Sequence, residues 1–205
     1  MNHYNFRGII LASQSPRREK LLSKMGIRFQ IIPSNLKEMP AMDDLPNAYA
    51  ARTAMEKAVK VGEKHPGHLV IGADTVVALG DQIMGKPRTR EEAFSMLNRL
   101  SNQWHTVWTG ICVYNYLYGL EVVRAVSTEV CFRNLSSRDI EDYVATDEPM
   151  DKAGGYAIQG LGHSLIREIK GSYHNVIGLP TMELGKILDD LGISTDSSLS
   201  DLTYE

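Results

Sequence analysis

Apolar and polar positions alternate along this chain in a way that predicts short strands and amphipathic helices in turn. The apolar run Gly8–Leu11 predicts a buried strand. The segment Pro16–Met25 predicts a helix, with Ser15 as its N-cap, Pro16 at the first helical position and Gly26 as its stop. The chain therefore enters a strand, turns and continues as a helix within its first 26 residues.

A second helix is predicted from about Asn47 to Lys64, because small and apolar side chains recur there at helical spacing. These side chains are Ala50, Ala51, Ala54, Met55, Ala58 and Val61. The following stretch, HLVIGADTVVALGDQIMGK, predicts two strands joined by a Gly-Asp turn. Thr89 and Glu92 predict a capping box for a third helix, whose apolar positions are Ala93, Met96, Leu97 and Leu100.

The second half of the chain predicts a long hairpin followed by shorter elements. We expect strands around Thr106–Tyr116 and Glu121–Phe132 with a turn at Gly119, then a helix from Ser136 with a Leu135–Ile140 hydrophobic staple. A glycine-rich stretch, Asp151–Gly162, comes next. It is followed by a strand near Ser164–Ile169 and a last helix from Pro180 to Gly192. This mixture predicts an α/β architecture with a mixed, partly antiparallel sheet. We expect one domain over residues 1–193 and a polar, disordered tail over 194–205.

Composition removes several classes of function. The net charge of −3 over 205 residues gives no general attraction to nucleic acid or to anionic membranes. No apolar stretch approaches the roughly 20 residues that cross a bilayer, and MNHYNFRG lacks the layout of a secretory signal. Cys112 and Cys131 are expected to be reduced, and no histidine has metal-site spacing to another His or Cys. We expect a cytoplasmic protein with no nucleic-acid polymer or membrane as partner.

The first loop, LASQSPRREKLL, is a candidate phosphate site. A strand leads through a polar turn into a helix, so backbone N–H groups and the Ser13 and Ser15 hydroxyls can face one ligand. Arg17 and Arg18 lie at the positive end of the helix, where a bound polyanion would supply the missing negative charge. Alternatively, both arginines extend into solvent or pair with a carboxylate. The loop is not a Walker motif.

Asp74 is a candidate catalytic base or metal ligand. It interrupts the apolar strand LVIGADTVVAL, where a carboxylate is costly to bury unless a cation or a hydrogen-bond donor compensates it. The alternative is an exposed Asp at a strand end or bulge, which the nearby Gly72 makes reasonable.

Two lysines and a second acid are further candidates. Lys57 lies near the edge of its helix's apolar stripe, and Lys86 precedes Pro87, which favours an extended backbone there. Taken singly, both lysines are typical of the surface. Glu38 is an ordinary loop acid unless it joins Asp74 at a metal.

The stretch DEPMDKAGGYAIQGLG is a candidate ligand loop. Its glycines permit close approach of the backbone to a ligand, and Asp151 and Lys152 precede them. The Gln159 amide can both donate and accept, as reading a nucleobase edge requires. The alternative is a flexible surface connection.

Six motifs in order, LASQSPRREKLL, EKA, GADTVV, GKP, DKAGGYAIQG and GSYHNVIGLP, resemble the Maf family of nucleoside triphosphate pyrophosphatases from about Ile9 to Leu191. The resemblance implies a two-lobed, Maf/ITPase-like α/β fold, with an elongated central mixed sheet flanked by helices and a cleft between the lobes. It also implies hydrolysis of a nucleoside triphosphate to monophosphate and pyrophosphate with a divalent cation, Mg²⁺ or Mn²⁺.

The resemblance also implies roles for individual residues. Asp74 corresponds to the general base, with Glu38, Lys57 and Lys86 as the other catalytic positions and Glu38 and Asp74 as the expected metal ligands. Expected substrate-binding residues are Ser13, Ser15, Arg17, Arg18, Thr75, Asp151, Lys152 and Gln159. Relatives usually have two acids in a row where this chain has Lys37 and Glu38, which puts a role for the first acid in doubt.

Arg17, Thr75 and Gln159 resemble the dTTP/UTP subgroup, with CTP and modified pyrimidine nucleotides as further candidate substrates. The 7-methyl-GTP subgroup tends to have Trp, Gln and Glu at these positions, and remains an alternative. A nucleotide-binding regulator of septum formation is a third, since the family is associated with septum inhibition. A homodimer is expected only by analogy.

Overall fold

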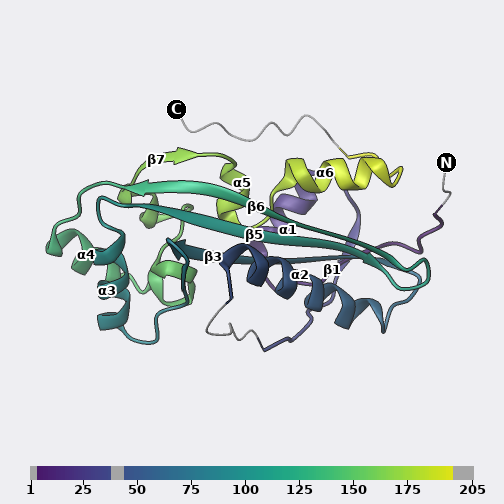
Figure 1. Cartoon of the computed structure of the whole chain (residues 1–205), viewed down its shortest axis with the longest axis horizontal. Helices are drawn as coiled ribbons and strands as arrows, with labels where there is room; N and C mark the ends of the chain where they lie inside the picture. The colour runs from purple at the N-terminus through teal and green to yellow at the C-terminus, as the bar shows by residue number, and fades with distance from the viewer. Residues whose placement is uncertain (1–3, 38–43, 196–205) are drawn as a thin grey trace.

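The computed structural model describes residues 4–37 and 44–195 as an elongated molecule with a single sheet along its length (Figure 1). The sheet has seven strands in the order β2-β1-β3-β5-β6-β7, and β4 pairs with β3 beside this path. The strands are β1 (Ile9–Leu11), β2 (Phe29–Ile31), β3 (Leu69–Leu79), β4 (Gln82–Met84), β5 (Trp104–Asn115), β6 (Leu120–Phe132) and β7 (Ile166–Lys170).

The sheet combines a parallel part and an antiparallel part. Strands β2, β1 and β3 are parallel, and β3, β5, β6 and β7 are successively antiparallel. Parallel neighbours need a crossover connection, and the helices α1 and α2 supply it. The predicted α/β class with a mixed, partly antiparallel sheet is therefore confirmed.

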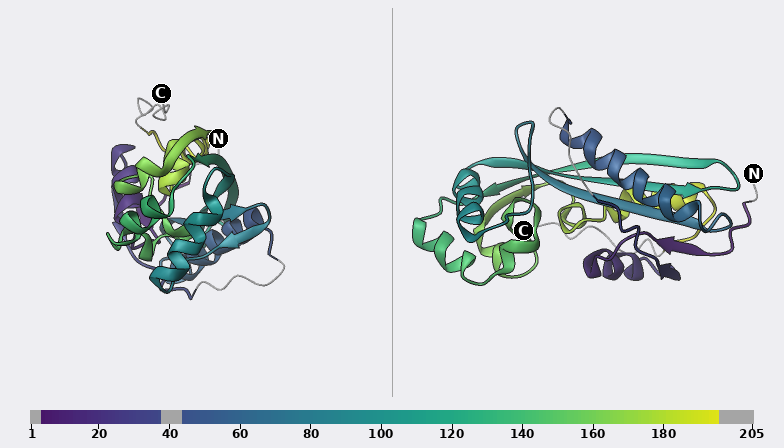
Figure 2. Two further views of the ribbon diagram at one scale, coloured as in Figure 1. Left: turned by 90° about the vertical axis from the view of Figure 1, so that its left-hand side faces the viewer. Right: turned by 90° about the horizontal axis from the view of Figure 1, so that it is seen from below.

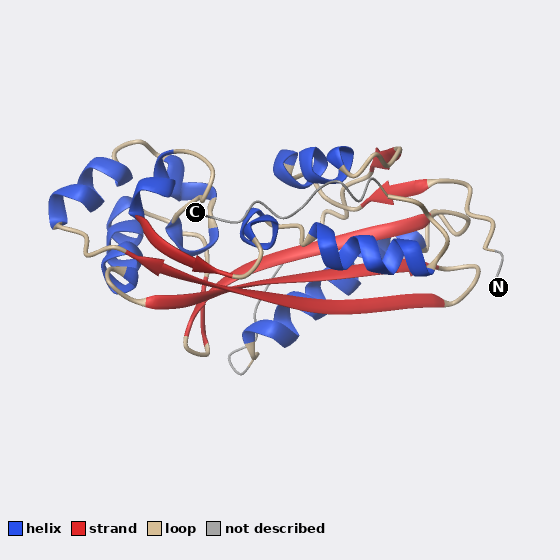
Figure 3. Ribbon diagram, turned by 90° about the horizontal axis from the view of Figure 1, so that it is seen from above, coloured by secondary structure: helices blue, strands red, loops and turns tan. Residues whose placement is uncertain are grey.

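Helices cover both faces of the sheet and one of its ends. They are α1 (Pro16–Lys24), α2 (Pro46–Gly62), α3 (Arg90–Leu100), α4 (Ser137–Val144), α5 (Tyr173–Ile177) and α6 (Thr181–Asp190), with 3₁₀ helices η1 (Glu148–Asp151), η2 (Ala153–Gly155) and η3 (Leu161–Leu165). Seen from above, α6 lies over the sheet, and α2 lies behind the strands (Figure 3). Helices α3 and α4 gather at one end of the molecule (Figure 2).

The two faces of the sheet bury separate hydrophobic clusters. Successive strand residues point to opposite faces, so Leu11 and Ile71 join the larger cluster with α1, α3 and α6. Their neighbours Ile10 and Val70 join the smaller cluster beneath α2, where Ala54 is fully buried. Because both faces of these strands are buried, their sequences are nearly continuous apolar runs.

Helix α2 lies unusually close to β3 and β5 because two strand glycines face it. A Cβ added to Gly72 would lie 2.2 Å from the carbonyl oxygen of Ala54. A Cβ added to Gly110 would lie 2.0 Å from that of Ala50. Any side chain at either position would push the helix away, so the glycines fix the depth of α2.

The predicted elements are present with small shifts at their ends, and the structure adds several that the sequence did not predict. The strand expected near Ser164–Ile169 is β7, and the additions are β2, α5 and the three 3₁₀ helices. The capping box expected at α3 is half wrong: the Thr89 hydroxyl accepts from the Glu92 N–H, but the Glu92 carboxylate accepts from the Arg88 N–H. A reciprocal box forms instead between Ser136 and Asp139 at α4.

Two expectations from composition have structural outcomes. Cys112 and Cys131 are both buried and free, as predicted. Within the described ranges, no helix combines the length and apolarity that a membrane span requires. The expected tail falls mostly outside the described part of the chain, which ends at residue 195.

Candidate active site

The cleft forms where one edge of β3 loses its strand neighbours. Strand β1 pairs with β3 only as far as Ile71, and β4 pairs with it from Val77 onward. Within the described residues, the edge between these points faces loops instead of a strand, and Asp74 and Thr75 lie there. Ligands of α/β proteins commonly bind beyond the carboxyl ends of parallel strands, and this gap opens at the carboxyl end of β1.

Asp74 and Lys57 form a buried ion pair beside this edge. The Lys57 Nζ lies 2.7 Å from the Asp74 Oδ1, and the two side chains are 7% and 6% exposed. Asp74 pairs across the sheet with Gly110, and it faces α2, which carries Lys57. The close approach of α2 therefore brings the ammonium within hydrogen-bond distance of the carboxylate, and the cation compensates the buried negative charge.

Arg18 ties the first loop to the rest of the cleft. Its Nε donates to the Gly178 carbonyl at 2.8 Å, and its two terminal nitrogens donate to Ser13 Oγ at 3.3 Å and Thr75 Oγ1 at 3.0 Å. Ser15 caps α1 by accepting from the Arg18 backbone N–H at 3.4 Å. The guanidinium thus joins three segments that are distant in sequence and holds the loop in position.

A buried hydrogen-bond chain supports the floor of the cleft. The Thr75 and Thr109 hydroxyl oxygens lie 2.9 Å apart, and Thr109 donates to the Asn175 carbonyl at 2.9 Å. The Asn175 amide nitrogen contacts the Val107 carbonyl and the Thr128 hydroxyl at 3.0 and 3.1 Å. These contacts join β3, β5, β6 and α5 beneath the point where Thr75 meets the cleft.

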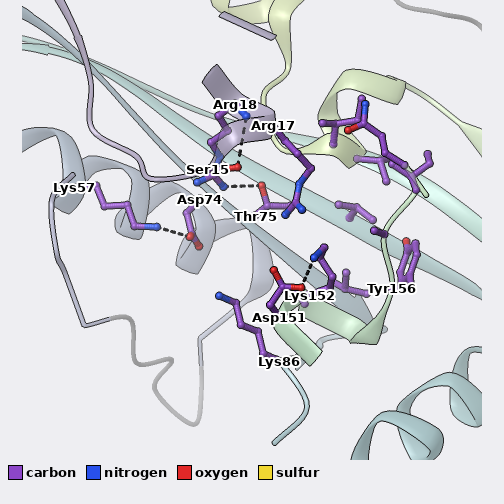
Figure 4. A pocket seen from close by; sticks show the side chains of 18 residues that line it. Ser15, Arg17, Arg18, Lys57, Asp74, Thr75, Lys86, Asp151, Lys152 and Tyr156 are labelled. Carbon is purple, nitrogen blue, oxygen red and sulfur yellow. Dashed lines mark hydrogen bonds and ion pairs between the residues drawn. The ribbon is translucent and has the colours of Figure 1, made fainter. Parts of the chain in front are cut away.

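Further cations and one exposed acid line the cleft. Arg17, Lys86, Asp151 and Lys152 converge on the same space as Asp74 (Figure 4). The Lys152 ammonium contacts the Asp151 carboxylate, and this hydrogen bond, reinforced by the charges of Lys152 and Arg17, lowers the pKa of Asp151. Asp151 is therefore a carboxylate at neutral pH.

Tyr156 also lines the cleft and is held from behind. Its hydroxyl lies 2.7 Å from the Nε2 of buried His105, and both rings pack edge-on against Phe132. Burial lowers the pKa of His105 to about 4, so the imidazole is neutral near pH 7. Burial also raises the pKa of Tyr156, so the phenol stays protonated.

The space enclosed by these walls consists of two adjoining hollows of about 180 and 580 Å³. Both are lined by Ser15, Arg17, Arg18, Lys57, Lys86 and Asp151. The smaller one extends toward Thr75, Tyr156 and Gln159, and the larger one toward Ser13 and Asn35. Together they offer the size of a small-molecule site, polar and cationic at one end and more apolar at the other.

Comparison with known proteins identifies the family. The family described as "Maf-like protein" matches residues 8–191, nearly the full length of the chain. The chain belongs to the Maf family.

Several members of the Maf family are similar over most of their length. A protein of Syntrophus aciditrophicus is 43% identical over 92% of each chain. One of Clostridioides difficile is 45% identical over 88% of this chain and 93% of its own. One of Aquifex aeolicus is 42% identical over 90% of this chain and 96% of its own. Each of the three is named "dTTP/UTP pyrophosphatase". The solved structure of the Staphylococcus aureus Ham1 protein is a weaker match, at TM-score 0.44 and 15% identity over 77% of this chain and 79% of that one.

The structure brings most of the predicted site residues together. Around the two hollows lie Ser13, Ser15, Arg17, Arg18, Lys57, Asp74, Thr75, Lys86, Asp151, Lys152 and Gln159. Glu38, expected as a catalytic residue and metal ligand, falls outside the described residues. The alternative of an exposed Asp74 is wrong, since Asp74 is 4% exposed in mid-strand. Lys57, typical of a surface lysine when taken singly, is buried at 6% exposure.

Several residues of the site were missed by sequence reasoning. Tyr156 stands within the quoted motif and lines the cleft, while Thr109 and Asn175 support it from below. A buried Asn and Thr have no local sequence signal, because their partners come from other strands. The position of Tyr156, between the glycine pair and Gln159, could have marked it as a lining residue.

The donor set can be compared with what a divalent cation needs. Nucleotide-bound Mg²⁺ is typically held by one or two carboxylates together with phosphate oxygens of the substrate. Asp74 and Asp151 supply carboxylates at the cleft. Within residues 4–37 and 44–195, no group of three His, Cys, Asp or Glu side chains gathers as a metal cage. The described residues therefore fit a cation shared with the substrate.

Proposed function

We propose that this protein hydrolyses dTTP and UTP to the nucleoside monophosphate and pyrophosphate. The observation that carries the proposal is the buried Asp74 carboxylate, paired with Lys57 at 2.7 Å, in a cleft lined by Arg17, Lys86 and Lys152. A base at the centre of a cationic cleft suits hydrolysis of a polyphosphate. The names of the Maf relatives support the choice of pyrimidine nucleotides.

In the proposed reaction, water attacks the α-phosphorus of the triphosphate. Asp74 accepts a proton from the water while the water oxygen forms a bond to the α-phosphorus. The bond between the α-phosphorus and the oxygen that bridges it to the β-phosphorus breaks. The pair of electrons leaves with pyrophosphate. Lys57 compensates the charge of the carboxylate and holds it in orientation, because its ammonium is within hydrogen-bond distance of Oδ1.

The cleft's cations would bind the polyphosphate and stabilise the charge that grows on the leaving group. Arg17, Lys86 and Lys152 come from three separate segments, so they can contact different phosphates of one chain. Asp74, and Glu38 by family resemblance, would hold the divalent cation. When bound, this cation would supply Lewis-acid stabilisation of the phosphate oxygens.

The base would occupy the end of the cleft near Gln159. Arg17, Thr75 and Gln159, the three positions that suggested the pyrimidine subgroup, all line the smaller hollow. The Gln159 amide can donate to a pyrimidine carbonyl and accept from its N–H, whereas a carboxylate could only accept. This asymmetry favours thymine and uracil over a methylated, cationic purine.

Pyrophosphate release over a panel of nucleoside triphosphates tests the proposal. The protein is incubated with dTTP, UTP, CTP, dATP, dGTP and 7-methyl-GTP, each with Mg²⁺, with Mn²⁺ and with EDTA. We expect turnover of dTTP and UTP with either cation and none in EDTA. Turnover of 7-methyl-GTP alone would contradict the substrate assignment. Binding of nucleotides without turnover under any condition would contradict the proposed enzyme.

Two substitutions test the residue roles. We expect Asp74→Asn to lower kcat by about two to four orders of magnitude, as loss of a general base does. Asp81→Asn, in the exposed turn between β3 and β4, is the matched control and should keep full activity. Gln159→Glu should weaken dTTP turnover more than turnover of other bases. An unchanged preference would remove Gln159 from base recognition.

A further inference from the structure

Glu148 is a half-buried acid that the proposed chemistry does not use. It begins η1, three residues after the Ala145 cap of α4, and the residue before it, Asp147, has a φ of 59°. Its carboxylate accepts three hydrogen bonds: from the Tyr143 hydroxyl at 2.9 Å and from the backbone N–H groups of Leu161 and Gly162 at 3.1 and 3.0 Å. An acid with this many fixed donors holds a segment of backbone in place.

The segment that it holds is the one that carries Gln159. The Tyr143 hydroxyl, which donates to Glu148, also accepts from the Ala157 N–H at 3.3 Å. The Glu148 carboxylate and the Tyr143 hydroxyl therefore accept hydrogen bonds from the backbone on both sides of Gln159, at Ala157 and at Leu161–Gly162. Burial, followed by the hydrogen bond to Glu148, raises the pKa of Tyr143, so this donor stays protonated across the neutral range.

Two glycines are required by these close contacts. Gly160 has a φ of +115°, and a Cβ there would lie 2.6 Å from the Glu148 Oε2. A Cβ on Gly162 would lie 2.5 Å from the Ala157 carbonyl oxygen and 2.6 Å from the Tyr143 hydroxyl. Gly160 and Gly162 thus leave room for the Glu148 carboxylate and the Tyr143 phenol, which lets both groups hydrogen-bond the loop.

Glu148 also links the two parts of the cleft wall. Three residues after it, Asp151 reaches the phosphate end of the cleft, while Gln159 lines the smaller hollow. A movement of Glu148 would therefore change the distance between the phosphate-binding segment and the base-reading amide.

We propose that Glu148 is a positioning residue for base recognition, acting through Tyr143 and the 161–162 backbone to fix Gln159 in the cleft. The inference rests on the proposed nucleotide function. It predicts that loss of these hydrogen bonds weakens binding of the base and leaves binding of the phosphates intact.

Glu148→Gln is the most direct variant. Both carboxylate oxygens accept from backbone N–H groups, so an amide must present its NH₂ to one of them in either orientation. The variant loses a charged hydrogen bond that holds the loop, so we expect the Kd and KM for dTTP to rise about tenfold. The preference for dTTP over dATP should fall in the same variant.

Three controls separate positioning from general damage. Glu141→Gln makes the same change at an exposed site on α4 and should match the wild type. Tyr143→Phe keeps the ring and removes the hydroxyl, and should reproduce the loss of preference. Inorganic tripolyphosphate, which has no base, should inhibit competitively with a Ki within about twofold of wild type in both loop variants.

The outcomes decide the proposal. An unchanged dTTP-to-dATP preference in Glu148→Gln would overturn it, as would a tripolyphosphate Ki that rises as much as the KM for dTTP. Binding of α,β-imido-dTTP is measured by calorimetry beside turnover. An inactive wild type would contradict the proposed pyrophosphatase activity, while the Kd values would still test the role of Glu148. A wild type that binds neither ligand would overturn both.

Discussion

Removing Lys57 from its pair with Asp74 should cost both stability and activity. Lys57→Met keeps most of the side chain's length and volume and deletes the ammonium. The Asp74 carboxylate then stays in a site where the side chains are only 6–7% exposed, so most of its charge is left without compensation. The loss of the cation and the burial both favour the neutral form, so the carboxyl takes up a proton and can no longer accept one from water.

The size of the effect follows from the burial. Removing one partner of a buried, hydrogen-bonded ion pair costs about 3–5 kcal/mol. A protein of this size loses roughly 2–4 °C of Tm per kcal/mol, so we expect a drop of about 6–20 °C. We expect kcat to fall at least about a hundredfold, because the base is lost.

A double variant separates the two effects. In Lys57→Met with Asp74→Leu no charge stays buried, so most of the stability should return. Activity should not return, because the base is absent. Chemical unfolding and pyrophosphate release are measured on the wild type, both singles and the double, with Lys64→Met just beyond α2 as the exposed control. A stable Lys57→Met, or a double whose loss equals the sum of the singles, would refute the coupling.

Three further substitutions have defined outcomes. Arg18→Lys cannot reproduce the fork to Gly178, Ser13 and Thr75, so the KM for dTTP should rise several-fold and the unfolding free energy should fall by about 1–3 kcal/mol, with exposed Arg28→Lys neutral. In Gly110→Ala the methyl group would meet the Ala50 carbonyl, so unfolding free energy should drop by about 1–3 kcal/mol and activity should fall, while Gly85→Ala, with open space, should not change either. Between pH 6.5 and about 4 His105 is protonated in the unfolded chain but not in the folded one. The free energy of unfolding should therefore fall by up to about 3 kcal/mol as the pH is lowered through this range. Thermal melts of His105→Gln should show a smaller change of Tm with pH.

Periodicity was sufficient to predict the main elements and their order. The nearly continuous apolar run of β3 and the small-residue stripe of α2 are long, so each indicates its own structure. Strand β2 has three half-buried or exposed residues, and α5 has five residues, too few for any period to be recognised. The glycine-rich stretch gave no pattern because its backbone is held by residues outside it, such as Glu148 and Tyr143 at Ala157 and Leu161–Gly162.

Most of the residues expected at the site line the cleft, but its geometry could not be predicted. The cost of burying a carboxylate identified Asp74 as a candidate, yet the sequence did not show which cation compensates it. Lys57 does so because Gly72 and Gly110 let α2 settle against the sheet, and that depth depends on packing between distant segments. The partners of a buried polar group are set by tertiary register, which no local pattern contains.

The arginine pair at the start of α1 shows how the fold divides two similar charges. Both lie at the positive end of a helix, where a cation is unfavourable without an anion or acceptor nearby. Arg18 meets this need within the protein, because its guanidinium donates to the Gly178 carbonyl at the end of α5 and to two hydroxyl groups. Arg17 instead faces the cleft beside Asp151, whose pKa it helps to lower. The charge of Arg18 is thus largely used to build the site, and Arg17 is the better placed of the two to neutralise a bound phosphate.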